Sequence, residues 1–267
     1  MPMADGSDVG QGFDRSAGDY DDLLRRNRGG AERLVASLPP GRYDRVLDVG
    51  CGTGFVTEAM VGRFGTRSVT GVDPSEGMLE RFREKLDGLG LEADLHVAGV
   101  HEMPVPDDAY DAVVSGMAFH WFPEKPAAVK AMARRLRAGG VMGILASGRG
   151  TDEELRLLLS AIDPPVPPSW VEVFDLIHRD VEELATYMQD AGLEVLDAWE
   201  ERRVRRVSPE AYLARIGAVA GHLSAGLDPA EAEAHAARVA EAVTRASGPD
   251  GFRYAFVKLY GVARLPD

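Results

Sequence analysis

The sequence predicts an α/β fold, a doubly wound and mostly parallel sheet of seven strands. Short apolar segments that are typical of strands alternate with amphipathic helical segments as far as residue 147. These strands are uniformly apolar, as expected when both faces of a sheet are covered. A glycine-rich turn also follows the first strand, and an acid closes the second, which is typical of a nucleoside-binding α/β site.

The N-terminal 40 residues are predicted to precede the sheet. Residues 1–12 are rich in Gly, Asp and Met and are expected to be disordered. Apolar residues then recur on one side of a helix from Phe13 to Leu38, which Pro39-Pro40-Gly41 ends. We therefore expect a helical lid at 13–40 within a single domain that covers 13–267.

Residues 41–147 are predicted to form the ligand-binding core. The expected strands are 45–49, 69–72, 95–98, 111–115 and 141–146. The expected helices are 55–64, 74–89 and 126–137, the last of which Gly139-Gly140 ends.

The C-terminal part, 148–267, departs from this rhythm. Helices are expected at 152–159 and 180–191, separated by a stiff proline-rich loop at 162–168, and a sixth strand at 193–204. Two alanine-rich helices follow at 209–222 and 228–246, before a seventh strand at 252–264. This helical insertion, about 205–247, is expected to wall a substrate pocket, with a dimer surface as the alternative. The chain is accordingly expected to be a monomer or a homodimer.

The composition limits the classes of partner and the cellular compartment that are expected for this protein. With 43 acids and 30 bases the net charge is −13, which disfavours nucleic acid. The basic run 202–206 is interpreted as a solvated strand edge rather than an anion site. One cysteine, no signal peptide and no apolar run of about 18 residues indicate a cytoplasmic protein without a membrane partner.

The glycine loop spans Val46 to Gly54. Gly50, Gly52 and Gly54 follow the spacing Gly-x-Gly-x-Gly, not the Gly-x-Gly-x-x-Gly of dinucleotide enzymes. Glycines allow a ligand to approach the main chain closely. Asp73, at the end of the second strand, offers a carboxylate that can accept hydrogen bonds from both hydroxyls of a ribose.

Five segments occur in an order that resembles a known family. They are Val46–Gly54, Asp73, Pro104–Val114, His120-Trp121-Phe122 and Arg135–Gly140. Together they resemble the class I S-adenosylmethionine-dependent methyltransferases, of the small-molecule type with a His-Trp pair after the fourth strand. The resemblance implies a Rossmann-like sheet, S-adenosyl-L-methionine as cofactor, and methyl transfer to a small-molecule acceptor by in-line displacement.

The resemblance also implies the cofactor-binding residues. Asp73 is expected to hold the ribose, while Asp48 either meets the methionine amine or supports the loop. Pro74 and Met78 are expected to flank the adenine, with ordinary core packing as the alternative for Met78. The complete predicted set is Tyr20, Asp48, Gly50, Cys51, Gly52, Asp73, Pro74, Met78, Val100, His101 and Ser115.

The third strand departs from the family pattern. Relatives often carry an acid for the adenine amino group, followed by Ala-Glu, where this chain has Gly99, Val100 and His101. Val100 and His101 are expected beside the adenine ring, and Glu102 replaces the family's glutamate if the loop is one residue shorter. Backbone carbonyls near Ser115 are expected to hold the methionine ammonium.

Two residues are candidates for catalysis. His120 can act as general base, since its ordinary pKa is near 6.5, or it can cap the turn that follows the fourth strand. Tyr20 can bond the methionine carboxylate or touch the acceptor, or it can fasten its helix to the sheet; Arg25 and Arg26 are alternative partners for that carboxylate. No metal site is expected, since the six histidines are scattered. A non-methylating enzyme with the same cofactor, a nicotinamide oxidoreductase and a non-catalytic binding protein remain alternatives, and the acceptor is not specified.

Overall fold

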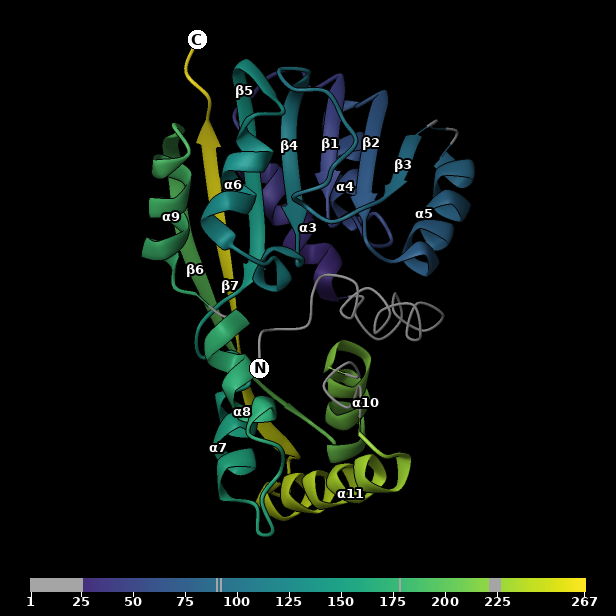
Figure 1. The fold of residues 1–267 in the computed structure, drawn as a ribbon, viewed down its shortest axis with the longest axis vertical. Helices are drawn as coiled ribbons and strands as arrows, with labels where there is room; N and C mark the ends of the chain where they lie inside the picture. Colours follow the sequence, from purple (N-terminus) through teal and green to yellow (C-terminus); the bar gives the residue numbers. More distant parts are fainter. Residues whose placement is uncertain (1–25, 90, 92, 178, 221–226) are drawn as a thin grey trace.

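The computed structural model describes residues 26–89, 91, 93–177, 179–220 and 227–267. Within them, seven strands form one sheet in the order β3-β2-β1-β4-β5-β7-β6. Strands β1 to β5 are parallel, and β7 runs antiparallel to both β5 and β6. The predicted seven-stranded, mostly parallel fold is therefore confirmed (Figure 1). The strands are β1 (Arg45–Val49), β2 (Ser68–Asp73), β3 (Ala93–Val97), β4 (Tyr110–Gly116), β5 (Leu136–Ser147), β6 (Glu194–Val207) and β7 (Phe252–Arg264).

Helices cover both faces of this sheet. On one face, α3 (Arg26–Ser37) and α4 (Phe55–Phe64) pack on alternate side chains of β1, β4, β5 and β7. On the other face lie α6 (Lys125–Ala133) and α9 (Val181–Asp190), packed over the remaining side chains of the central strands. Helix α5 (Glu76–Leu89) covers β2 and β3. Strands β1, β2, β4 and most of β5 thus bury both of their faces, which explains their lack of polar alternation, whereas the edge strand β6 is largely exposed.

A helical cap extends the molecule beyond the sheet. It consists of α7 (Glu153–Ala161), α8 (Ser169–Ile177), α10 (Pro209–Ala220), α11 (Pro229–Ala246) and the far ends of β6 and β7 (Figure 1). These elements share a hydrophobic core of their own, in which Trp170, Tyr212, Val243 and Tyr254 are buried. The predicted insertion between the sixth and seventh strands is present, and α7 and α8 join it from the connection between β5 and β6.

Several boundaries differ from the predicted ones. Strand β5 begins at Leu136, inside the helix predicted to reach Arg137, because Leu136 pairs with Tyr110 ahead of an irregularity in the ladder. Strand β3 begins two residues early, and β6 continues to Val207. Helix α8 was missed, since it directly follows the prolines that predict a loop. The predicted lid helix is represented by α3; residues 13–25, Tyr20 and the expected disorder of 1–12 lie outside the described residues.

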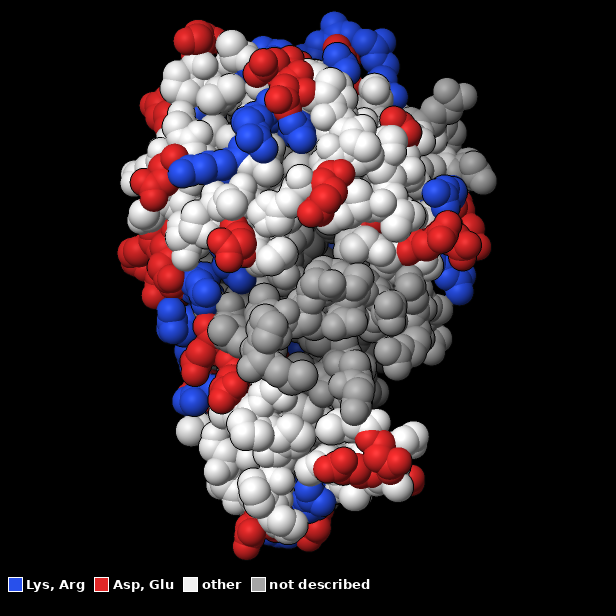
Figure 2. All heavy atoms as spheres, viewed as in Figure 1, with Lys and Arg blue, Asp and Glu red and all other residues white. Residues whose placement is uncertain are grey.

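The visible surface mixes charges of both signs. Acidic side chains are scattered over the sheet part and the cap, with basic side chains between them (Figure 2). Within the described ranges, no helix is both long and apolar enough to span a membrane. In the same ranges, no group of three or more His, Cys, Asp or Glu side chains is arranged to hold a metal ion.

Candidate functional site

The glycine loop joins the ends of the first two strands at the edge where parallel strands present ligand sites. After β1, the amides of Gly50 and Cys51 both donate to the carbonyl of Val72, at 2.7 and 3.1 Å. The amide of Gly54 then donates to the carbonyl of Cys51 at 2.9 Å, and α4 begins at the next residue. The loop is therefore fixed to β2 by main-chain bonds, independently of any ligand.

Glycine is required at Gly50 for space as well as conformation. Its φ is +65°, and a Cβ there would lie 2.3 Å from the Cβ of Ala118. Gly52 is different: its φ is +51°, and a Cβ would meet nothing within 4 Å. The main chain at Gly52 thus borders open space, as expected where a ligand lies against the backbone.

Asp73, the last residue of β2, lies next to Gly52, and both residues line the same cleft. Asp73 is 8% exposed; its Oδ2 accepts the amide of Gly52 at 2.8 Å and its Oδ1 accepts the amide of Ser75 at 2.9 Å. A carboxylate has about four lone-pair positions, so capacity remains on each oxygen for a further donor. The two backbone bonds hold the carboxylate in place for a polyhydroxyl ligand.

Asp48 lies deeper in the same cleft. It is 1% exposed, and its Oδ2 accepts the hydroxyl of Thr57 at 2.9 Å. Among the described residues its Oδ1 has no hydrogen-bond partner. Burial, and then the nearby charge of Asp73, raise the pKa of Asp48 to about 7, against the lowering effect of Thr57. An incompletely satisfied buried carboxyl of this kind suits a cationic ligand group.

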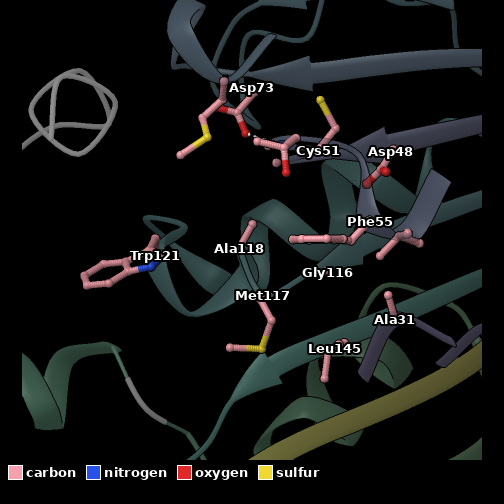
Figure 3. A pocket seen from close by; sticks show the side chains of 15 residues that line it. Ala31, Asp48, Cys51, Phe55, Asp73, Gly116, Met117, Ala118, Trp121 and Leu145 are labelled. Atoms are coloured by element: carbon pink, nitrogen blue, oxygen red, sulfur yellow. Dashed lines mark hydrogen bonds between the residues drawn. The ribbon is translucent and has the colours of Figure 1, made fainter. Parts of the chain in front are cut away.

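The opposite wall of the cleft is largely apolar. Met117, Ala118 and Trp121 follow β4, and Leu145 lies near the end of β5 (Figure 3). Met117 has a φ of +58°, so the chain turns sharply at the end of β4 and presents these side chains to the cleft. Ala31 of α3 and Phe55 of α4 complete the wall. These contributions come from five elements, which explains why sequence spacing did not identify Ala31, Phe55 or Leu145.

Six of the predicted cofactor residues line this one cleft. They are Asp48, Gly50, Cys51, Gly52, Asp73 and Met78. Cys51 is 7% exposed, and burial raises the pKa of its thiol, with further contributions from Asp73 and Asp48. A thiol that burial keeps protonated suits a packing role beneath the loop rather than a nucleophilic one.

Other predicted residues lie outside the described cleft lining. Val100 is buried in the core, while His101 is exposed and its Nε2 lies 3.2 Å from the carbonyl oxygen of Pro123. Ser115 is fully buried, and its hydroxyl has no hydrogen-bond partner within the described ranges. Its neighbour Gly116 reaches the cleft instead. Contacts of Pro74, Val100, His101 and Ser115 with a cofactor stay predictions.

His120 occupies a one-turn 3₁₀ helix, Phe119–Trp121, after β4. It is 6% exposed, and its Nδ1 accepts the amide of Ser147 at 3.4 Å. Because Nδ1 is used as an acceptor, this contact favours the neutral tautomer with its proton on Nε2. Such an imidazole offers Nε2–H as a donor. Trp121 lines the cleft, whereas Phe122 packs edge-on against Phe119 with ring centroids 5.8 Å apart.

The site fits S-adenosylmethionine by its own chemistry. The free oxygen of Asp48 suits the ammonium, the carboxylate of Asp73 suits the ribose hydroxyls, and Gly52 leaves space against the main chain. The remaining wall is apolar and matches the methylene groups and the purine of such a molecule.

Comparisons with known proteins agree with this fit. Residues 46–140 match the family described as a methyltransferase domain. The malonyl-[acyl-carrier protein] O-methyltransferase of Halorhodospira halophila is 32% identical over 190 residues, covering 69% of this chain. The chain spans 60% of the length of that relative.

Two further relatives and one solved structure extend the comparison. The Geobacter sulfurreducens protein of the same name is 28% identical over 98% of this chain and 100% of its own length. The trans-aconitate 2-methyltransferase of Rhizobium rhizogenes is 33% identical over 48% of each chain. The [4+2]-cyclase SpnF, at 18% identity, matches the fold with a TM-score of 0.64 over 100% of this chain and 98% of its own. Residues 46–140 thus form a methyltransferase domain, and the sheet order and the cleft agree with the class I S-adenosylmethionine-dependent methyltransferases that the sequence resembles.

Proposed function

We propose that the protein transfers the methyl group of S-adenosylmethionine to a carboxylate oxygen of a small organic acid or a carrier-bound acyl group. Cofactor binding is supported by Asp48, which lines the cleft and whose buried Oδ1 has no hydrogen-bond partner among the described residues. Methylation of an acid is supported by two relatives whose names specify acids, a malonyl group on a carrier protein and trans-aconitate.

The cleft residues have distinct roles in this proposal. The cofactor supplies an electrophilic methyl carbon on a sulfonium, so that a C–O bond forms as a C–S bond breaks. Asp48 binds the ammonium and Asp73 binds the ribose, which together fix the position of the donor. Trp121, Met117 and Leu145 exclude water from the reacting atoms. Most of the acceleration in this type of transfer comes from such positioning.

His120 acts as a hydrogen-bond donor in this proposal, not as a base. Its Nδ1 faces the amide of Ser147, so the neutral ring carries its proton on Nε2. A carboxylate acceptor is already ionised at neutral pH and needs no base. A donor can instead orient the carboxylate through one oxygen while the other oxygen is methylated.

The test is methyl transfer from S-adenosylmethionine labelled in its methyl group. Trans-aconitate and malonyl-acyl carrier protein are the two acceptors to be tried. The proposal expects label in at least one product, released as methanol by mild alkali because methyl esters hydrolyse readily. Label in a product that resists alkali would overturn carboxylate methylation, and consumption of substrate without label would indicate a non-methylating enzyme.

A further inference from the structure

A second cavity, of about 150 Å³, lies between the start of α3 and the paired strands β6 and β7. Its charged lining consists of Arg33, Arg203, Arg205, Lys258 and one acid, Glu201. We call this cavity the basic pocket. It brings four cationic side chains together in a protein whose net charge is −13.

The pleat of β6 explains why these residues converge. Successive side chains of a strand point to opposite faces, so Glu201, Arg203 and Arg205 share one face, and Arg202 and Arg206 lie on the other. In the β6–β7 ladder, Glu201 pairs with Lys258 and Arg203 with Phe256, which puts Lys258 on the same face. The alternation therefore places Arg203 and Arg205 on the face that lines the cavity, and Arg202 and Arg206 on the opposite face.

Among the described residues of its lining, the basic pocket has more cationic than acidic side chains. Glu201 forms ion pairs with Arg33 and, at 3.4 Å, with Arg203, so a single carboxylate serves two guanidinium groups. Tyr260 adds a neutral donor, since burial, and then Glu201, raise its pKa to about 12. An excess of cations around a cavity favours an anionic ligand, and guanidinium groups match carboxylate geometry well.

The basic pocket adjoins the cofactor cleft. A Cβ at Gly30 would lie 2.5 Å from Nζ of Lys258 and 3.0 Å from Cδ2 of Leu145. Leu145, and Ala31 next to Gly30, line the cofactor cleft. The ammonium of Lys258 thus lies at the wall shared by the two cavities, close to where an acceptor meets the apolar end of the cleft.

We propose that the basic pocket binds a second acid group of the acceptor, distinct from the carboxylate that receives the methyl group. This inference rests on the proposed function and narrows it, because it specifies an acceptor with at least two acid groups. Lys258 and Arg203 hold the remote carboxylate, and the reacting carboxylate then extends toward Met117 and Trp121. The occupant is a carboxylate; a phosphate is a different outcome of the test.

The experiment is calorimetric titration of the whole protein saturated with S-adenosylhomocysteine. The probes are trans-aconitate, which has three carboxylates, crotonate, which has one, and inorganic phosphate. We expect trans-aconitate to bind, with affinity about tenfold lower in Lys258→Met and in Arg203→Gln, since each loses one charge-assisted contact. Crotonate is expected to bind more weakly and with the same affinity in all variants.

Arg206→Gln is the matched control, because it removes the same charge from the opposite face of the same strand. We expect it to bind trans-aconitate as the wild type does. Equal losses in the control and in Lys258→Met, or no loss in either, would overturn the basic pocket as a subsite. So would wild-type protein that binds no trans-aconitate, or phosphate that binds more tightly than the tricarboxylate.

Failure of the proposed function is a separate outcome, since it would appear as absent binding of S-adenosylhomocysteine itself. Arg203 is an exposed side chain with 63% of its surface accessible, so Arg203→Gln tests the basic pocket even if Lys258→Met does not fold.

Discussion

At the scale of single residues, Asp48 is the most informative side chain. A buried carboxyl oxygen without a partner destabilises a fold by about 1–3 kcal/mol or more. Oδ1 of Asp48 is such an atom within the described part of the chain, and a cationic ligand group in the cleft would satisfy it. The family resemblance left the role of Asp48 open between loop support and ligand contact. Asp48 does contact α4 through Thr57, and we propose that its other oxygen, which has no hydrogen-bond partner within the described ranges, binds the ligand.

We predict that cofactor binding strengthens with pH because of Asp48. Burial raises the pKa of this acid to about 7, so the protonated form dominates well below pH 7. An ammonium favours the carboxylate, so affinity for S-adenosylhomocysteine should rise between about pH 5.5 and 7.5 and level off above, with proton release on binding. Calorimetry in buffers of different ionisation enthalpy measures both effects.

The same carboxyl has a defined effect on stability. Its folded pKa is raised above the unfolded value, so the folded protein binds more protons between about pH 4 and 7, and its contribution to stability falls as the pH rises through that window. Asp48→Asn should remove this fall and weaken cofactor binding at least about tenfold. A variant whose binding kept the wild-type pH dependence would contradict the assignment of Asp48.

At the scale of elements, the glycine loop depends on shape more than on side-chain chemistry. We predict that Gly50→Ala destabilises the fold by about 1–3 kcal/mol and impairs cofactor binding, since its new Cβ would collide with Ala118 at a φ of +65°. Gly62→Ala, in α4 with nothing within 4 Å, is the matched control and should be neutral or slightly stabilising. Denaturant unfolding of both variants measures the difference, and equal effects would refute the steric argument.

The cap is held together by a buried ion pair. Arg215 of α10 pairs with Asp152, which precedes α7, and its guanidinium lies 4.7 Å from the ring centroid of Tyr254. The hydroxyl of Tyr212 also donates to Asp152, at 2.9 Å. These contacts join a helix of the β6–β7 connection to one of the β5–β6 connection.

We predict that Arg215→Met destabilises the protein by about 3–5 kcal/mol, because Asp152 is left buried with its charge uncompensated. Adding Asp152→Asn should recover much of that loss, since the uncompensated charge is then removed as well. Equilibrium unfolding in urea compares the two variants. A double variant no more stable than Arg215→Met would show that packing, rather than charge, dominates at this position.

Strands β1, β2, β4 and the second half of β5 were predictable because each is an apolar run bounded by glycine, proline or acid. Prediction from the sequence fails where tertiary contacts determine the bounds or the existence of an element. Leu136 extends β5 because it pairs with Tyr110, a contact 26 positions away in the sequence. Helix α8 becomes stable by burying Trp170 among cap residues from distant segments, which no local pattern indicates.

At the scale of the whole molecule, the cleft at the glycine loop and the proposed acceptor subsite lie on different elements of the fold. The glycine loop and Asp73 belong to the sheet, with its own hydrophobic cores, and the cap has a further core built on the far ends of the paired strands β6 and β7 (Figure 1). The basic pocket lies on these two strands, beside the cofactor cleft. The predicted cofactor residues that line the cleft are close in sequence because they lie in or directly after β1 and β2, which explains why a sequence motif could identify them.

The residues of the proposed acceptor subsite could not be grouped from the sequence alone, for a physical reason. Arg203 and Lys258 become neighbours only through the antiparallel pairing of β6 with β7, and Arg33 reaches them from α3. The sequence favoured a solvated strand edge for the run 202–206; β6 is indeed the edge strand and these residues are exposed, while Arg203 and Arg205 also line the basic pocket. Charge clusters of this kind depend on strand register, which a single sequence does not define.

The most direct test of the account is a calorimetric titration of S-adenosylmethionine into the wild-type protein and into Asp73→Ala. We predict one binding site in the wild type and at least about tenfold weaker binding in Asp73→Ala, which loses the acceptor for the ribose. Glu84→Ala, which removes an exposed acid on α5, should bind as the wild type does. Absence of binding to the wild type, or equal binding by Asp73→Ala, would contradict the account.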